Sequence, residues 1–186
     1  MVTTTDSTDI VTQAKIIEQH QPSFKRWLKH VCHIPSAKRF YSKQDQHAIA
    51  QAVAEAEHGH VGEIQVVIEA CLPAAIAYQH DTLSRARQLF AELGTWDTEY
   101  NSGVLLYLNL CERKVEIVID RGIRNATTQE IWDGICQNIL QQLSDKKYKE
   151  ALVDGIFEIG KVLDAYYDRK IQDLDNEISN QPIILG

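Results

Sequence analysis

The residues best suited to chemistry in this sequence are carboxylates and amides that flank apolar, strand-like segments. Glu63 lies at the start of one such segment, Asp97 and Asn101 precede a second, and Asp120 with Arg121 follows a third. Oxygen ligands that converge from separate segments suit a hard cation such as Ca²⁺ or Mg²⁺. Two carboxylates a few ångströms apart repel each other, and a bound cation relieves that repulsion. These residues therefore predict a cation site, provided that the fold brings them together.

Three β-strands must position these side chains. The stretch 61–72 alternates and is rich in β-branched residues, and 103–110 and 115–120 are apolar runs joined by a short polar turn. The turn predicts an antiparallel hairpin, and the helical pattern over 74–93 predicts a right-handed crossover between two parallel strands. The starts of the first two strands and the end of the third then share one end of the sheet.

Helical spacing of apolar residues surrounds these strands, which predicts helices on both sheet faces and thus an α/β/α sandwich with a small mixed sheet. We expect an N-terminal helical arm over 1–38, the sandwich over 39–178 and a C-terminal tail over 179–186. The expected helices cover 9–31 (interrupted at Pro22), 42–58, 74–93, 127–143 and 148–178.

Simpler roles for the same residues stay open. Asp97 also suits a loop cap, Asp120 before Arg-Gly also suits a turn, and Glu63 also suits an ion pair with Arg121 or Arg124. The histidines of EHGHVGEI, residues 57–64, lack further ligands at metal-site spacing, which favours a helix-terminal role over transition-metal binding.

Composition excludes several classes of function. The sequence holds 19 Lys and Arg against 26 Asp and Glu, for a net charge of −7, which argues against binding nucleic acid or anionic lipid. The four cysteines are far apart and lack zinc-site spacing, as in a reduced cytoplasmic protein. There is no signal-peptide pattern, no apolar run long enough for membrane insertion, and no Walker, GxGxxG, GxSxG or HExxH motif.

Three stretches carry a resemblance to a known family: GEIQVVIE (62–69), NSGVLLYLNLCERKVEIVIDRGI (101–123) and KKYKEALVDGI (146–156). Over roughly residues 40–168 the chain resembles the TPM domain family, which includes a plant thylakoid acid phosphatase and a photosystem II repair protein. The resemblance implies an α/β/α sandwich with an acidic cleft at one sheet end, where some members bind Ca²⁺. Carried over by position, the ligands would be Glu63, Asp97, Asn101 and Asp120. The sequence after the third strand reads RGIRNA, without the glycine-rich, acidic stretch of many members.

Two functions follow from this resemblance. The first is a soluble, non-catalytic binding or scaffold module that acts with an unidentified protein partner in assembly or quality control of membrane complexes. The alternative is a weak, metal-assisted acid phosphatase in which Asp97 and Asp120 hold the ion and Arg121 steadies the phosphate. We expect Ca²⁺ or Mg²⁺ in either case, and no organic cofactor.

Overall fold

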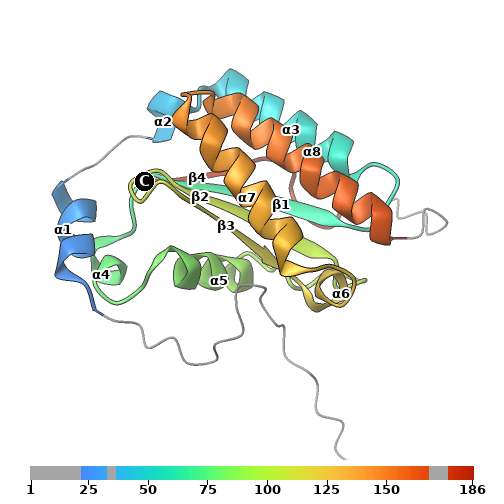
Figure 1. Ribbon diagram of the computed structural model, residues 1–186, viewed down its shortest axis with the longest axis horizontal. Helices are drawn as coiled ribbons and strands as arrows, with labels where there is room; N and C mark the ends of the chain where they lie inside the picture. The colour runs from blue at the N-terminus through green and yellow to red at the C-terminus, as the bar shows by residue number, and fades with distance from the viewer. Residues whose placement is uncertain (1–21, 33–36, 168–175) are drawn as a thin grey trace, which may run out of the picture.

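The structure is a computed structural model that describes residues 22–32, 37–167 and 176–186. Helices precede, separate and follow the strands, as Figure 1 shows. No helix among the described residues is both long and apolar enough to cross a bilayer. In chain order the elements are α1 (Phe24–Cys32), α2 (Ala37–Phe40), α3 (Lys43–Glu57), β1 (Glu63–Glu69), α4 (Ala74–Ala77), α5 (Thr82–Glu92), β2 (Gly103–Asn109), β3 (Lys114–Ile119), α6 (Arg121–Arg124), α7 (Gln129–Ser144), α8 (Tyr148–Tyr166) and β4 (Ile183–Leu185).

The strands form one mixed sheet in the order β3-β2-β1-β4. β1 and β2 are parallel, with Glu63 opposite Gly103 at one end and Glu69 opposite Asn109 at the other. β2 and β3 form an antiparallel hairpin. The parallel pair and the antiparallel third strand expected from the sequence are therefore confirmed.

β4 lies within the stretch 179–186 that the sequence analysis assigned to a tail. It runs parallel to the second half of β1, with Ile183 opposite Val67 and Leu185 opposite Glu69. Three residues are too few for a periodic signal, so only the neighbouring strand reveals this element.

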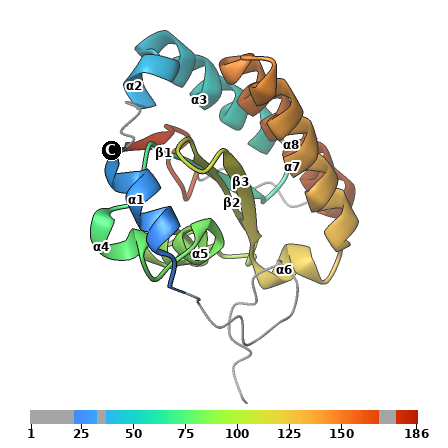
Figure 2. The ribbon, with the colours of Figure 1, turned by 60° about the vertical axis from the view of Figure 1, so that its left-hand side comes forward.

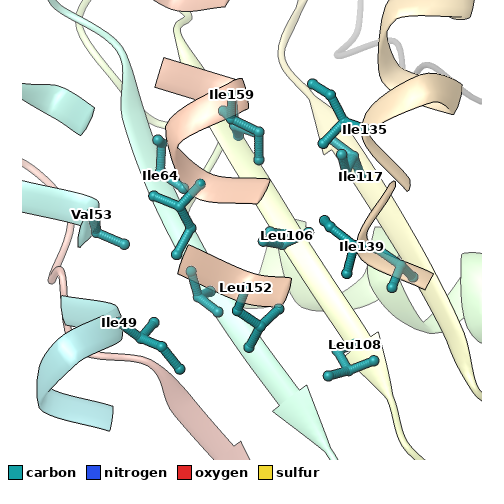
Figure 3. Packing of buried hydrophobic residues seen from close by; sticks show 14 of the residues in the cluster. Ile49, Val53, Ile64, Leu106, Leu108, Ile117, Ile135, Ile139, Leu152 and Ile159 are labelled. Atoms are coloured by element: carbon teal, nitrogen blue, oxygen red, sulfur yellow. The ribbon is translucent and has the colours of Figure 1, made fainter. Parts of the chain in front are cut away.

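The sheet separates two apolar layers because successive side chains of a strand point to opposite faces. From β1, Ile64 and Ile68 enter the larger cluster with α3, α7 and α8, whereas Val67 enters the smaller one with α5. Figure 1 shows the three long helices on one side of the sheet and α5 on the other, and Figure 3 shows the larger cluster from close by. Each fully buried aliphatic side chain contributes about 1.5–3 kcal/mol of transfer free energy. The expected α/β/α sandwich is confirmed.

Two glycines let α8 approach its neighbours closely. A Cβ at Gly160 would lie 2.8 Å from the Cβ of Ala56 on α3, and one at Gly155 would lie 2.5 Å from Ile139 on α7. The three helices therefore pack as one layer over the sheet.

Several helices differ from their expected bounds. The helix expected over 74–93 is divided into α4 and α5, because Asp81 accepts the N–H of Ser84 over 2.8 Å and begins a new helix. The helix expected over 148–178 ends at Tyr166, and residues 176–178 are not helical. The short helices α2 and α6 were not expected. By contrast, Ser42 caps α3 as expected, in a reciprocal capping box with Asp45.

The described part of the N-terminal arm contacts the sandwich through α1. Arg26 donates from Nε to the carbonyl of Ala77 over 2.8 Å, and the N–H of Ser23 donates to Tyr78 over 3.0 Å. Figure 2 shows α1 against α4. On α1, Phe24 and Leu28 remain exposed. The first half of the expected arm helix, 9–21, lies outside the described residues.

Candidate functional site

The start of β2 joins the two acids that the sequence analysis placed at one end of the sheet. Glu63 is the register partner of Gly103, and the N–H of Asp120 donates to the Gly103 carbonyl over 2.9 Å. Gly103 itself has no room for a side chain, because a Cβ there would lie 1.8 Å from the Thr95 carbonyl oxygen. Glu63 and Asp120 thus flank the same backbone position from opposite sides. We call the group built around them the sheet-end site.

Asp120 is the most deeply buried acid of this site, with 1% of its surface exposed. It caps α6 by accepting the N–H of Arg121 at Oδ1 over 2.6 Å, whereas Oδ2 is buried and has no hydrogen-bond partner among the described residues. Burial raises the pKa of Asp120, and the N–H and charge of Arg121 partly oppose that rise. One oxygen of this carboxylate therefore caps α6, and the other is buried without a hydrogen bond to the described residues.

Glu63 lies beside a second acid that the sequence analysis did not identify. Glu63 accepts the N–H of Ile178 at Oε2 over 3.2 Å, and Glu57, the last residue of α3, accepts the N–H of Ile64 at Oε1 over 2.8 Å. Burial, with a smaller contribution from the nearby Glu63 carboxylate, raises the pKa of Glu57 to about 8 despite the opposing effect of the Ile64 N–H. Glu57 therefore carries its proton at neutral pH, which lessens the repulsion between the two acids.

Asn101 and Arg121 are held together at the same end. Arg121 donates from Nε to Asn101 Oδ1 over 3.1 Å, and the N–H of Gly122 donates to the Asn101 carbonyl over 3.1 Å. Asn101 has a φ of 52°, a left-handed conformation that asparagine tolerates better than most residues. These contacts fix the guanidinium close to the Asp120 carboxylate.

Tyr167, which follows α8, completes the group and was also not predicted. Its hydroxyl is buried without a hydrogen-bond partner in the described part of the chain and lies 3.1 Å from where a Gly122 Cβ would be. Burial and the charge of Asp120 raise the pKa of Tyr167 to about 12. The site thus holds two buried oxygens, Asp120 Oδ2 and the Tyr167 hydroxyl, that make no hydrogen bond within the described structure.

Asp97 has a different setting. It is exposed on the loop between α5 and β2. Among the described residues, the carboxylate oxygens of Glu63, Asp97 and Asp120 do not all lie within 4.8 Å of one another. The structure therefore places Glu63 and Asp120 on either side of β2 at one end of the sheet and links Arg121 to Asn101 by a hydrogen bond, without a three-carboxylate cluster among the described residues. Of the two histidines weighed for metal binding, His58 is exposed, and His60 accepts the N–H of Gly62 at Nδ1.

The donor set fits a hard cation better than a soft one, because its side chains offer oxygen. Asp120 Oδ2 makes no hydrogen bond with the described residues, so coordination of an ion by this atom would displace no such bond. Glu63 and Asn101 are the further oxygen donors of the set. Arg121 adds a positive charge, which would favour an anion bound beside the cation.

The sandwich with a mixed sheet and an acidic end defines the class of protein. Residues 37–162 match the TPM domain, and because this match covers more than half of the chain, the chain belongs to the TPM domain family. The structure is similar to the NMR structure of the BA42 protein from the psychrophilic bacterium Bizionia argentinensis. The TM-score is 0.70 at 29% identity, over 80% of this chain and 98% of that chain.

A second solved structure shares the fold. It is the N-terminal domain of a protein from P. gingivalis, with a TM-score of 0.57 at 18% identity, over 75% of this chain and 88% of that one. A comparison with curated proteins gave no match. The family expected from the sequence is thus confirmed.

Proposed function

We propose that this chain is a non-catalytic binding module whose sheet-end site holds a divalent cation. One observation carries the proposal: Asp120 Oδ2 is buried and makes no hydrogen bond with any part of the chain that the structure describes. A buried carboxylate oxygen without a partner costs free energy that a bound ion would recover. Glu63 and Asn101 are the further ligands we propose, with Ca²⁺ or Mg²⁺ as the ion.

The same site suits binding to a protein partner. With Glu57 protonated and Arg121 held by Asn101, the site offers mixed charge instead of a uniformly acidic surface. We propose that a loaded site docks a partner in the assembly or quality control of larger complexes, as the family resemblance suggests. The thiols of all four cysteines, none of them in a disulfide, support a reducing compartment such as the cytoplasm.

NMR titration with Ca²⁺ and with Mg²⁺ tests the cation site. We expect shifts centred on the amides of Arg121, Gly122 and Ile178 in the parent, and none in Asp120→Asn. Asparagine caps helices as well as aspartate does, so this variant keeps α6 while it changes the charge and half of the donor set. Asp133→Asn, on exposed α7 surface, is the matched control and should bind as the parent does. Shifts that persist in Asp120→Asn would refute the site.

Asp97 was predicted as a ligand from sequence, and its exposure now suggests a minor contribution. We expect Asp97→Asn to weaken cation binding less than tenfold. A loss as large as that of Asp120→Asn would show that the α5–β2 loop closes over the ion.

A phosphatase is the second candidate, and the hydrogen bond from Arg121 to Asn101 favours it, because it holds a guanidinium where a phosphate would meet the cation. Hydrolysis of a chromogenic phosphate monoester by the pure protein with Mg²⁺ tests this candidate. The enzyme hypothesis predicts turnover that is lost in Asp97→Ala and in Asp120→Ala. Turnover that persists in both variants would exclude the mechanism.

A further inference from the structure

A group of sulfur and nitrogen donors lies at the opposite end of the same strands. Cys71 comes two residues after β1, Cys111 comes two residues after β2, and His30 belongs to α1. One ring nitrogen of His30 and the two sulfur atoms all lie within 4.8 Å of one another. The N–H of Cys111 donates to the Ala70 carbonyl over 2.9 Å, which keeps the two cysteine-bearing segments side by side.

His30 has a buried side chain with an unusual pair of contacts. Nδ1 accepts the N–H of Leu72 over 3.0 Å. Nε2 lies 3.2 Å from Glu112 Oε1, yet neither of these two buried atoms makes a hydrogen bond within residues 22–32, 37–167 and 176–186. Burial lowers the pKa of His30, so the ring is neutral near pH 7 and suited to ligation.

The two thiols are protonated in the structure as described. Burial raises the pKa of Cys71 to about 12 and also raises the pKa of Cys111. Cys111 Sγ donates to the carbonyl of Lys29, 3.6 Å away on α1. Such thiols are poor nucleophiles, whereas a soft cation that displaces their protons would turn them into strong ligands.

We propose that His30, Cys71 and Cys111 bind one Zn²⁺ ion, and that Glu112, which contacts His30 but lies outside this group of three donors, moves toward the sulfurs to become the fourth ligand. Bonds of about 2.0 Å to nitrogen and oxygen and about 2.3 Å to sulfur put tetrahedral ligand atoms roughly 3.3–3.8 Å apart. The 3.2 Å between His30 Nε2 and Glu112 Oε1 already matches this spacing. The two sulfurs and one His30 nitrogen lie within 4.8 Å of one another, so these three atoms need to move inward by about an ångström. The Glu112 carboxylate needs a separate movement toward the sulfurs.

Binding of Zn²⁺ at this site releases two protons and leaves a small net charge. Zn²⁺ forms two Zn–S bonds, and the two thiol protons pass to the buffer. Two thiolates, one carboxylate and the ion leave one net negative charge, which Lys29 partly offsets because its Nζ lies 3.5 Å from Glu112 Oε1. Ligation through Nε2 puts the ring proton on Nδ1, so the Leu72 N–H loses its acceptor.

Titration of the reduced, metal-free chain with Co²⁺, as a spectroscopic substitute for Zn²⁺, tests the proposal. We expect an intense thiolate-to-cobalt charge-transfer band that saturates at one ion per chain and is bleached by Zn²⁺. Calorimetry in buffers of different ionisation enthalpy should show two protons released per Zn²⁺. The Leu72 amide should shift strongly in the NMR spectrum. Absence of the band in the parent would overturn the proposal without any variant.

Matched variants locate the site. Cys32→Ser changes an exposed thiol on the same helix as His30 and should leave the band intact. Cys71→Ser and Cys111→Ser should each lower Co²⁺ affinity by at least a hundredfold, and circular dichroism checks that they remain folded. If neither cysteine variant folds, His30→Gln takes their place and should weaken binding similarly. Unchanged affinity in the folded variants would refute the assignment.

Discussion

The hydroxyl of Tyr107 donates to Glu69 Oε2 over 2.6 Å, inside the layer between the sheet and α5. The same carboxylate accepts a hydrogen bond from Arg85 Nη2 on α5 over 3.0 Å. Glu69 is 2% exposed, so its charge depends on these two partners. The network joins the end of β1 to α5 within an otherwise apolar layer.

Removal of Arg85, the cationic partner of Glu69, should lower the stability of the fold. We expect Arg85→Met to lower the free energy of unfolding by about 3–5 kcal/mol, because it leaves a buried carboxylate without its counter-charge. Chemical denaturation measures this change, with Arg39→Met, at an exposed position, as the control. The double variant Arg85→Met with Glu69→Gln should recover much of the loss. A single variant within 1 kcal/mol of the parent would contradict the proposed dependence.

Glu57 should make stability depend on pH. Its pKa of about 8 in the folded protein exceeds the ordinary value of 4.5, so the folded state holds a proton that the unfolded state releases. The free energy of unfolding therefore falls as pH rises from about 4.5 to about 8 and then levels off. Glu57→Gln keeps the acceptor for the Ile64 N–H and should flatten this decline. Glu55→Gln, exposed on the same helix, should follow the parent, and an equal slope in Glu57→Gln would argue against a raised pKa.

Two glycine-to-alanine changes should act in opposite directions. In Gly103→Ala, the new methyl group would lie 1.8 Å from the Thr95 carbonyl oxygen, so β2 must shift at a cost of at least about 3 kcal/mol. In Gly134→Ala, on α7, the methyl group meets nothing within 4 Å, and helix propensity should add about 0.5–1 kcal/mol. Thermal unfolding of the two variants and the parent measures whether each substitution raises or lowers the stability. Equal behaviour would contradict the packing described around Gly103.

The Tyr167→Phe variant tests the stability of the cation-free protein and the binding of Ca²⁺ as two separate effects. The Tyr167 hydroxyl is buried and has no hydrogen-bond partner among the residues that the structure describes, so its removal should leave the cation-free protein as stable as the parent, or up to about 1 kcal/mol more stable. If the cation site includes this hydroxyl, the rise in melting temperature on adding Ca²⁺ should be smaller in the variant. A clear loss of stability without Ca²⁺ would indicate that the hydroxyl has a structural partner.

The directions of the strands made part of the sheet-end site predictable from sequence. Antiparallel pairing of the hairpin and the parallel crossover were enough to place Glu63 at the same end of the sheet as Asp120, with β2 between them. Glu57 and Tyr167 could not be found in this way, because they reach the site through the packing of α3 and α8 on the sheet. The exposure of Asp97 depends on the path of a loop, for which the sequence gives no periodic signal.

The same directional argument could have placed the cysteines. Glu69 and Asn109 are register partners in the parallel pair, and each is followed two residues later by a cysteine, Cys71 and Cys111. His30 was beyond such reasoning, since its position depends on how α1 packs on α4. Spacing rules for zinc motifs also fail here, because the donors come from three separate elements.

The short outer strand β4 has a consequence for the behaviour of the protein in solution. Ile183–Leu185 follows Pro182, which has no N–H to donate, and at the opposite margin β3 begins with the exposed Lys114. Brief strands, proline and lysine all discourage a foreign strand from adding to a sheet. We therefore expect concentrated solutions of this protein to resist fibril formation, even though its central strands are strongly apolar.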